Sequence, residues 1–412
     1  MAKVNSMKIK VALLFGGKSA EHDISVISAL QACRHLSRDK YDVYPVYITK
    51  DGEMYYGEET GSIEAYSNIE YLLSRSFRVS LVRDKGKVSL VYDKKPLLGS
   101  RRIADVDVAL PVVHGTNVED GTMQGYLQLL GLPYCGCDIL SSAVGMDKYV
   151  TKTILREAGI PVLDCIRARL AEYSEDPDAV IDSIEEKIGY PVIVKPVNCG
   201  SSIGISKASD RDSLKESLAD AFTYSDRILA ERAIVSLREI NCSVLGDGDA
   251  AEASECEEPV GSDEILSFND KYVGGTKGSA KGGAKSDADA KGMASLKRKI
   301  PAPITEEQRD YIRQTAVKAF RALGCGGISR IDFLLDAETG EIFFNEINTI
   351  PGSLSFYLWE PLGVKYTELL DRLIALALKR DRQNRALTYT FESSVLAGAS
   401  FGGVKGAKGC KG

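Results

Sequence analysis

The segment Ser329–Gly352, SRIDFLLDAETGEIFFNEINTIPG, has the pattern of two apolar strands joined by a tight turn. Glu346 and Asn348 are two residues apart on the second strand, so they share one face. If Asp332 of the first strand lies opposite Glu346, then Arg330 lies opposite its neighbour Asn348, and all four side chains point the same way. Carboxylate and amide oxygens suit Mg²⁺, whereas a solvated face would carry a looser mixture of Lys, Thr and Ser. The hairpin therefore predicts a magnesium site with Asp332, Glu346 and Asn348 as ligands.

A second glycine-bearing stretch, VIVKPVNCGSSIGISK (192–207), joins two strands. Lys195 ends an apolar run, Gly200 to Ser202 form a turn, and alternation resumes before any helix begins. A phosphate-binding P-loop or a dinucleotide-binding turn must open a helix, so neither fits. A plain Gly-Ser hairpin is one interpretation. The other is a flexible flap whose amides fold over phosphates, with Lys195 supplying a cation beneath it.

The beginning of the chain predicts a different unit. The run KIKVALLF (8–15) and the glycines after it predict a buried strand that feeds a helix, and strands are expected within 41–49 and 106–115. These elements predict an α/β domain with a doubly wound parallel sheet. The glycines do not form a P-loop, because the first Gly of that motif is replaced by Ala12. Glu21 either complements the dipole of the helix or takes part in a ligand site.

Composition limits the classes of function. A chain of 412 residues with 44% hydrophobic and 27% charged residues has the length of two or three globular domains. A net charge of −6 argues against binding to nucleic acid or to an anionic membrane. The apolar run near the start is too short for a signal segment or a membrane span, so we expect a cytoplasmic protein. Nine scattered cysteines favour reduced thiols over a zinc site.

The motifs occur in an order that resembles the D-alanine:D-alanine ligase family of ATP-grasp enzymes. They are GGKSAEHDIS (16–25), HGTNVEDGTMQGYLQLLGLPYCG (114–136), GMDKYVTK (145–152), IVKPVNCGSSIG (193–204), KY (271–272), RIDF (330–333) and NEINTIPG (345–352). The resemblance implies an α/β ATP-grasp fold of three domains. These are an N-terminal substrate domain (1–136), a central lid domain (137–231) and a C-terminal domain (232–380) with the magnesium site and a mobile lid loop (270–299), followed by a flexible tail (381–412).

The resemblance also implies roles for individual residues. The expected ATP-binding residues are Lys148, Lys195, Ser202, Glu231, Glu239 and Lys271. The expected catalytic residues are Glu21, Ser201 and Tyr272, which would link lid and substrate, together with Arg330 and the Gly352 amide at the oxyanion. The expected substrate-binding residues are His114, Ser353, Ser355 and Tyr357. Two Mg²⁺ ions, with Mn²⁺ as an alternative, would be held by Asp332, Glu346 and Asn348.

The reaction that the resemblance implies is the ATP-dependent joining of two D-alanines through an acyl phosphate, for peptidoglycan synthesis. Its partners would be small molecules, and the family suggests a homodimer. The stretch GSLSFYLWEP (352–361) is one residue longer than the usual acceptor motif, so the acceptor stays open. A D-alanine:D-serine or D-alanine:D-lactate ligase is one alternative, and Tyr272 favours an amino-acid acceptor. A non-catalytic ATP-binding relative is the other alternative.

Overall fold

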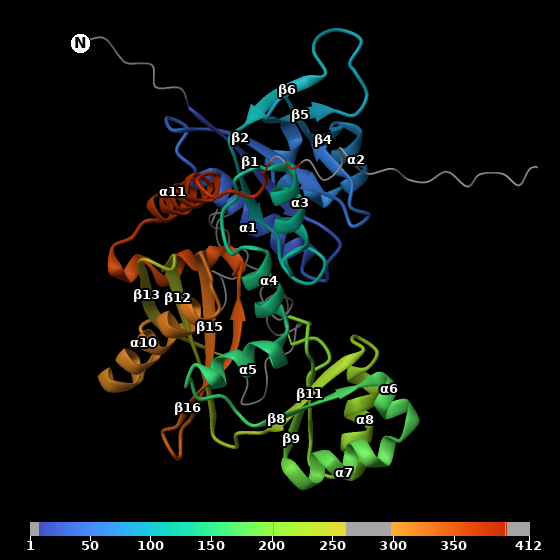
Figure 1. Cartoon of the computed structure of the whole chain (residues 1–412), viewed down its shortest axis with the longest axis vertical. Helices are drawn as coiled ribbons and strands as arrows, with labels where there is room; N and C mark the ends of the chain where they lie inside the picture. Colours follow the sequence, from blue (N-terminus) through green and yellow to red (C-terminus); the bar gives the residue numbers. More distant parts are fainter. Residues whose placement is uncertain (1–7, 201, 261–297, 392, 394–412) are drawn as a thin grey trace, which may run out of the picture.

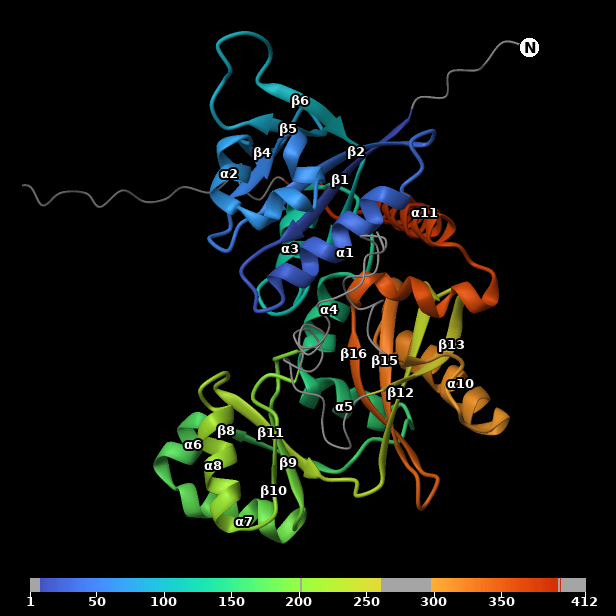
Figure 2. The same cartoon turned by 180° about the vertical axis from the view of Figure 1, so that it is seen from behind.

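The computed structural model describes residues 8–200, 202–260, 298–391 and 393. Three sheets carry the fold, with the amino-terminal sheet at one end, the middle sheet at the other and the carboxyl-terminal sheet between them (Figures 1 and 2). The predictions made for Ser201, Lys271, Tyr272 and most of the lid loop lie outside the described residues, as does nearly all of the stretch after 391. None of the helices in the described ranges combines the length and apolarity needed to cross a membrane.

The amino-terminal sheet has seven strands in the order β6-β5-β4-β3-β2-β1-β7. β1 pairs in parallel with β2 and β7, as predicted, and the remaining strands extend the sheet in antiparallel fashion. The continuous apolar run of β1 is buried because both sides of the sheet are covered. The strands are β1 (Ile9–Gly16), β2 (Tyr41–Ile48), β3 (Met54–Tyr56), β4 (Phe77–Asp84), β5 (Lys87–Tyr92), β6 (Arg102–Val106) and β7 (Val108–Val112); the helices are α1 (His22–His35), η1 (Glu58–Gly61), η2 (Glu64–Ser67), α2 (Ile69–Ser74) and α3 (Thr122–Leu130).

The middle sheet has four antiparallel strands in the order β10-β9-β11-β8. The two strands predicted on either side of Gly200 are confirmed, because Val194 pairs with Ser206 across the turn. Helices on this sheet complete a separate hydrophobic core that draws only on this unit. Its elements are β8 (Cys165–Arg169), α6 (Leu170–Glu175), α7 (Pro177–Lys187), β9 (Val192–Pro196), β10 (Ser206–Ala208), α8 (Arg211–Ala221) and β11 (Arg227–Arg232).

The carboxyl-terminal sheet has five antiparallel strands in the order β14-β13-β12-β15-β16. The predicted register of the hairpin is confirmed, since Asp332 pairs with Glu346 and Arg330 with Asn348. Its elements are β12 (Leu237–Gly246), β13 (Ala251–Pro259), β14 (Arg298–Lys299), α10 (Glu306–Ala322), β15 (Gly327–Asp336), β16 (Ile342–Asn348), η6 (Gly352–Leu358) and η7 (Glu360–Leu362).

Two segments pack away from the unit in which the sequence placed them. Helices α4 (Ile139–Met146) and α5 (Lys148–Glu157) contact β16, and Leu155 belongs to the core of the carboxyl-terminal sheet rather than that of the middle sheet. The last helix, α11 (Tyr366–Arg385), returns to α1 and β7, and Leu369 is buried in the core of the amino-terminal sheet. The apolar faces of these helices decide the packing, because each must cover a sheet that is otherwise exposed.

Candidate active site

Ion pairs and hydrogen bonds join α5 and β9 to β16, and this line of contact, where Lys148 and Lys195 meet Asn345 and Glu346, is termed the seam. The ammonium group of Lys148, at the start of α5, lies 3.2 Å from a carboxylate oxygen of Glu346 on β16. Lys195, on β9, donates to the amide oxygen of Asn345 at 3.1 Å. The register of the hairpin shifts beside Asn345, and nothing in the sequence signalled this bulge. Two predicted phosphate-binding lysines therefore lie beside the predicted metal face.

The metal face is already a network of charges. Arg330 holds Asp332 with two hydrogen bonds of 2.7 Å each, and the Asn348 amide donates to the same carboxylate at 3.1 Å. Burial disfavours the charge on Arg330, but Asp332 outweighs this effect and raises the pKa of the guanidinium. The register of one hairpin thus collects every side chain that the sequence assigned to the metal.

The donor set fits Mg²⁺ in its chemistry. Asp332, Glu346 and Asn348 offer the hard oxygen atoms that this ion prefers, and substrate phosphates commonly supply the rest of its coordination. Across residues 8–200, 202–260, 298–391 and 393, no group of three or more His, Cys, Asp or Glu could hold a metal ion. A site with two carboxylates and one amide is compatible with that finding. A bound ion would take over part of the charge that Arg330 and Lys148 balance.

A buried triad lies beneath the flap. The carboxylate of Glu231, on β11, forms ion pairs with both Lys195 and Lys152, and the Lys152 side chain has no exposed surface. Burial raises the pKa of Glu231, but the two ammonium groups outweigh it and lower the pKa to about 2. The sequence reasoning assigned Glu231 to ATP binding and missed Lys152. The sequence feature that could have identified Lys152 is its spacing of four residues from Lys148, which places both lysines on one side of α5.

Glu21 lies against Gly200 of the flap, and its predicted link to Ser201 lies outside the described residues. A Cβ atom placed on Gly200 would come within 3.0 Å of a Glu21 carboxylate oxygen. A second contact joins the same two units, because the Thr116 hydroxyl donates to the carbonyl oxygen of Asn198 at 2.9 Å. The loops of the amino-terminal sheet therefore close one side of the seam.

His114 is buried at the junction with the carboxyl-terminal unit. Its Nδ1 donates to the carbonyl of Ile350 at 2.8 Å, and its Nε2 lies 3.1 Å from the Ser28 hydroxyl. Burial lowers the pKa of His114 to about 4, and the nearby charge of Arg330 acts in the same direction. A neutral imidazole therefore fixes the turn that leads to Gly352.

Glu119 is a buried carboxyl group that the sequence reasoning did not single out, although it lies within the quoted motif HGTNVED. It accepts hydrogen bonds from the backbone of Gly115 at 3.0 Å and of Ile350 at 2.7 Å, and from the Thr349 hydroxyl at 3.3 Å. Burial and the neighbouring charge of Glu21 raise the pKa of Glu119 to about 8. This residue ties the amino-terminal loop to the end of β16.

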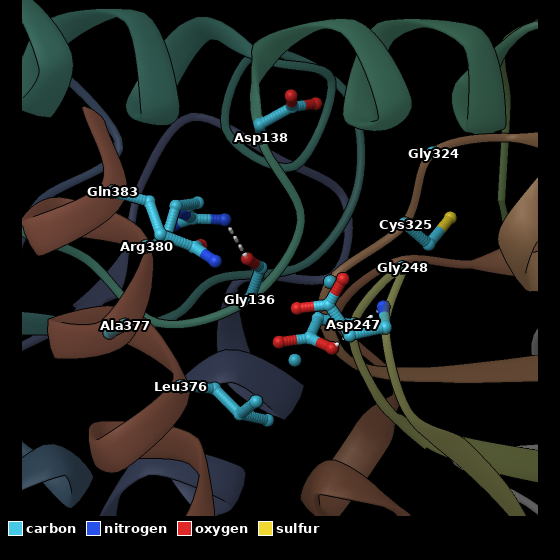
Figure 3. A pocket seen from close by; sticks show the side chains of 13 residues that line it. Gly136, Asp138, Asp247, Gly248, Gly324, Cys325, Leu376, Ala377, Arg380 and Gln383 are labelled. Carbon is cyan, nitrogen blue, oxygen red and sulfur yellow. Dashed lines mark hydrogen bonds between the residues drawn. The ribbon is translucent and has the colours of Figure 1, made fainter. Parts of the chain in front are cut away.

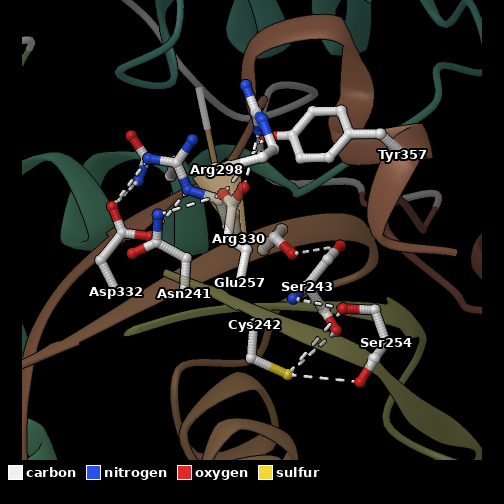
Figure 4. Close-up of polar contacts among 11 residues, drawn as sticks. Asn241, Cys242, Ser243, Ser254, Glu257, Arg298, Arg330, Asp332 and Tyr357 are labelled. Atoms are coloured by element: carbon white, nitrogen blue, oxygen red, sulfur yellow. Dashed lines mark hydrogen bonds and ion pairs between the residues drawn. The ribbon is translucent and has the colours of Figure 1, made fainter. Parts of the chain in front are cut away.

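The turn predicted to bind the second substrate has an unusual backbone. Residues 353–355 have φ values of 52°, 49° and 47°, which is a strained conformation for side chains other than glycine. Ser353 and Ser355 have no exposed surface, and the Ser353 hydroxyl donates to Gln31 at 2.8 Å. Tyr357 is also buried and points toward β13 (Figure 4). The burial of both serine hydroxyls argues against an open carboxylate site at those two groups.

Ser202 and Glu239 both lie within the described residues, and their contact with ATP stays a prediction. Ser202 follows the tip of the flap in a left-handed conformation, with φ of 59°. Glu239 lies on β12 two residues before Asn241, so both side chains share one face. Asn241 is opposite Asp332, which places Glu239 on the same face as the metal ligands. The sheet therefore brings Glu239 to the predicted metal face.

A pocket of about 210 Å³ lies elsewhere, between α11, the turn after β12 and the segments that precede α4 and β15 (Figure 3). Arg380 of α11 donates to the carbonyl of Gly136 at 2.7 Å, and Lys379 holds Asp247 and Asp249 at 2.7 Å each. The described residues that line this pocket include none of the predicted site residues. Arg380, Asp247 and Asp249 are thus already engaged by groups around the pocket, so it is a junction between units rather than the predicted site.

Known proteins are similar to this chain over most of its length. One family profile, described as "D-ala D-ala ligase N-terminus", matches residues 10–137, and another, "D-ala D-ala ligase C-terminus", matches residues 154–375. The D-alanine–D-alanine ligase of Acetivibrio thermocellus is 40% identical over 388 residues, which are 92% of this chain and 98% of that protein. The D-alanine–D-alanine ligase of Geobacillus thermodenitrificans is 39% identical over 394 residues, which are 94% and 100% of the two chains.

Two solved structures match this chain with nearly equal TM-scores. The VanG D-Ala:D-Ser ligase from Enterococcus faecalis has a TM-score of 0.73 at 30% identity, covering 90% of this chain and 100% of its own. The D-alanine-D-alanine ligase from Coxiella burnetii has a TM-score of 0.72 at 29% identity, covering 92% and 96%.

Proposed function

Because the chain belongs to the D-alanine–D-alanine ligase family, we propose that it is an ATP-dependent ligase that joins two D-alanine molecules for peptidoglycan synthesis. The observation that carries this proposal is the position of Lys148 and Lys195 beside the register-matched residues Asp332 and Glu346. Two ammonium groups next to two carboxylates are suited to bind a magnesium-bound triphosphate. Family membership names the reaction, and this seam supplies the charges that the reaction needs.

The chemistry accounts for the types of residue at the seam. A carboxylate does not acylate an amine at neutral pH, so the γ-phosphate of ATP first passes to the carboxylate of one D-alanine and gives an acyl phosphate and ADP. The amine of the second D-alanine then attacks the acyl carbon, and inorganic phosphate leaves. Lys148, Lys195 and Arg330 would offset negative charge during these steps. Mg²⁺, when bound, would neutralise phosphate oxygens in the same place.

Exclusion of water is the second requirement, because water would hydrolyse the acyl phosphate. The flap after β9 and the loops around Glu21 and Glu119 meet over the seam, and each is anchored by contacts to the other units. The middle sheet has its own hydrophobic core, so it is suited to move as one body over the nucleotide. We propose that Ser201, Lys271 and Tyr272 complete this closure.

The identity of the acceptor is a second question. A D-Ala:D-Ser ligase and a D-alanine-D-alanine ligase superpose on this chain with TM-scores of 0.73 and 0.72, so fold alone favours neither acceptor. The curated relatives at 40% and 39% identity are D-alanine–D-alanine ligases, and we therefore retain D-alanine as the acceptor. D-Serine is the alternative that a specific solved structure supports.

The deciding experiment is ADP release by the full chain with ATP, Mg²⁺ and D-alanine as the sole amino acid, followed by addition of D-serine or D-lactate. We expect turnover with D-alanine alone and a dipeptide product. Turnover only after D-serine or D-lactate is added would identify the other ligase activity. Binding of ATP without turnover under any of these conditions would refute both and favour a non-catalytic relative.

Several finer points extend the proposal. We propose two Mg²⁺ ions at the metal face, a cytoplasmic location, where ATP is supplied, and a homodimer. Metal titration by calorimetry would count the ions, and light scattering of the purified chain would give its mass in solution. The substrate, lid and metal-bearing units follow the three sheets, with α4 and α5 packed on the carboxyl-terminal one.

A further inference from the structure

A row of polar side chains extends the metal face across the carboxyl-terminal sheet. Asn241 on β12 is opposite Asp332 on one side and Glu257 of β13 on the other. These residues and Glu346 therefore occupy one face of four neighbouring strands. Because neighbouring strands lie about 4.8 Å apart, the backbone of Glu257 is about 10 Å from that of Asp332. The polar face continues well beyond the metal ligands.

A buried cation lies at the far end of this row. Arg298 donates to the carboxylate of Glu257 at 2.7 Å, and its guanidinium lies 4.0 Å from the centre of the Tyr357 ring (Figure 4). The Asn241 amide donates to Glu257 at 3.2 Å. The side chains of Arg298 and Glu257 are 10% and 1% exposed. The guanidinium is thus held in place from two directions, by a carboxylate and by an aromatic face.

Stability alone is a weak reason for this arrangement. Two charges taken out of water lose hydration free energy that their attraction only partly restores, and apolar side chains of similar size often stabilise a fold as well. A guanidinium fork has five N–H donors and commonly holds more than one acceptor, which is the property that recognition of a second carboxylate beside Glu257 requires.

The proposed reaction requires the carboxylate of the acceptor to be held close to the reacting atoms. The amine of the second amino acid attacks the acyl carbon, which lies next to the phosphoryl group near Asp332. One carbon atom separates the acceptor's carboxylate from that amine, so the carboxylate carbon lies about 2.5 Å from the attacking nitrogen. Other groups in the region are less suited to hold it. Ser353 and Ser355 have no exposed surface, and Arg330 is engaged with Asp332 through two bonds.

We propose that Arg298, held by Glu257 and stacked on Tyr357, binds the carboxylate of the acceptor amino acid. This inference rests on the proposed ligase function and names the residue that positions its second substrate. The contact recognises a free carboxylate and not the side chain. It therefore selects D-alanine or D-serine over a neutral amide and does not discriminate between these two amino acids.

The first test compares the wild-type enzyme with Arg298→Met in steady-state formation of the dipeptide. Loss of a charge-assisted pair should raise the half-saturating concentration of acceptor D-alanine by about 10- to 100-fold, with the maximal rate unchanged. Arg298→Lys should recover part of the loss. Lys299→Met is the matched control on the same short strand, since its side chain is 59% exposed, and it should behave as the wild type. A lower maximal rate with an unchanged half-saturating concentration would overturn the inference.

The second test changes the acceptor instead of the enzyme. D-Alaninamide keeps the amine and lacks the carboxylate, so Arg298→Met should slow ligation to D-alanine and leave ligation to D-alaninamide at its wild-type rate. Equal losses with both acceptors would indicate a structural role and refute the inference. The double variant Arg298→Met/Glu257→Gln leaves no buried carboxylate without its cation, so it provides the same comparison if the single variant does not fold. Wild-type enzyme that ligates no D-alanine would instead refute the proposed function.

Discussion

The triad of Glu231, Lys152 and Lys195 yields a quantitative prediction about stability. Glu231→Gln keeps the shape of the side chain but leaves two buried ammonium groups without their carboxylate. The pKa of Glu231 falls from 4.5 to about 2, which corresponds to about 3 kcal/mol, since one unit equals about 1.36 kcal/mol. Breaking a buried ion pair by removing one partner costs a similar amount, about 3 to 5 kcal/mol. We therefore expect the free energy of unfolding to fall by about 3 to 5 kcal/mol.

Equilibrium unfolding in urea, followed by far-ultraviolet circular dichroism at neutral pH, measures this loss. The matched control is Lys152→Met, which leaves Glu231 paired with Lys195 and should cost at most about 2 kcal/mol. The difference in the free energy of unfolding between the wild type and Glu231→Gln should also depend on pH. A lowered carboxyl pKa contributes stability that is present above pH 4.5 and is lost as the pH falls toward about 2. The free energies of unfolding of the two proteins should therefore approach each other as the pH falls from 4.5 to about 2.

Two results would refute this reasoning. One is a Glu231→Gln variant as stable as the wild type, which would mean that the ion pairs contribute no net stability. The other is a Lys152→Met variant that loses more stability than Glu231→Gln, which would mean that packing of the lysine stem matters more than charge.

Three further predictions concern the other parts of the site. Glu346→Gln should lower Mg²⁺-dependent ADP release by about 100-fold or more with an unchanged melting temperature, and retained activity would remove it from the metal site. The pKa of Glu119 is raised to about 8, so its contribution to stability is present below pH 4.5 and is lost as the pH rises through 8. Glu119→Gln should therefore lose less stability than the wild type between pH 6 and 9 in thermal melts, and parallel profiles would contradict this. Gly327→Ala should destabilise the fold by about 2 kcal/mol more than Gly340→Ala, because both have positive φ but only a Cβ on Gly327 meets the Gly136 backbone, at 2.6 Å. Equal melting temperatures for the two variants would contradict this prediction, because they would mean that the backbone segments at Gly327 and Gly136 separate at little cost.

The part of the site that the sequence predicted is the part built from local pattern. The side chains at Arg330, Asp332, Glu346 and Asn348 follow from a period of two residues and one register, and both the pairing and the shared face are confirmed. The flap could be recognised for a similar reason, because strands resume after Gly200 before a helix begins. Such rules depend only on neighbours in the chain, and a single sequence contains them in full.

Residues that act through distant partners escaped the sequence reasoning. Lys152 meets Glu231 across 79 positions of the chain, and Glu119 meets Ile350 across 231. The sequence placed Arg298 only within the predicted lid loop (270–299), and the sheet is what brings its guanidinium against the Tyr357 ring. Each of these side chains is buried, and burial depends on which surfaces pack together.

The packing of α5 and α11 shows the same difference between what local pattern predicts and what long-range packing decides. Their amphipathic patterns predicted helices, but those patterns could not choose which sheet each helix covers, because every sheet here presents an apolar surface of similar character. The sequence by itself determined the elements, the register of the hairpin that is predicted to bind metal, and the class of chemistry. Only the tertiary structure decided which distant charges share one seam, since the free energy of a buried charge depends on the partners that the fold places around it.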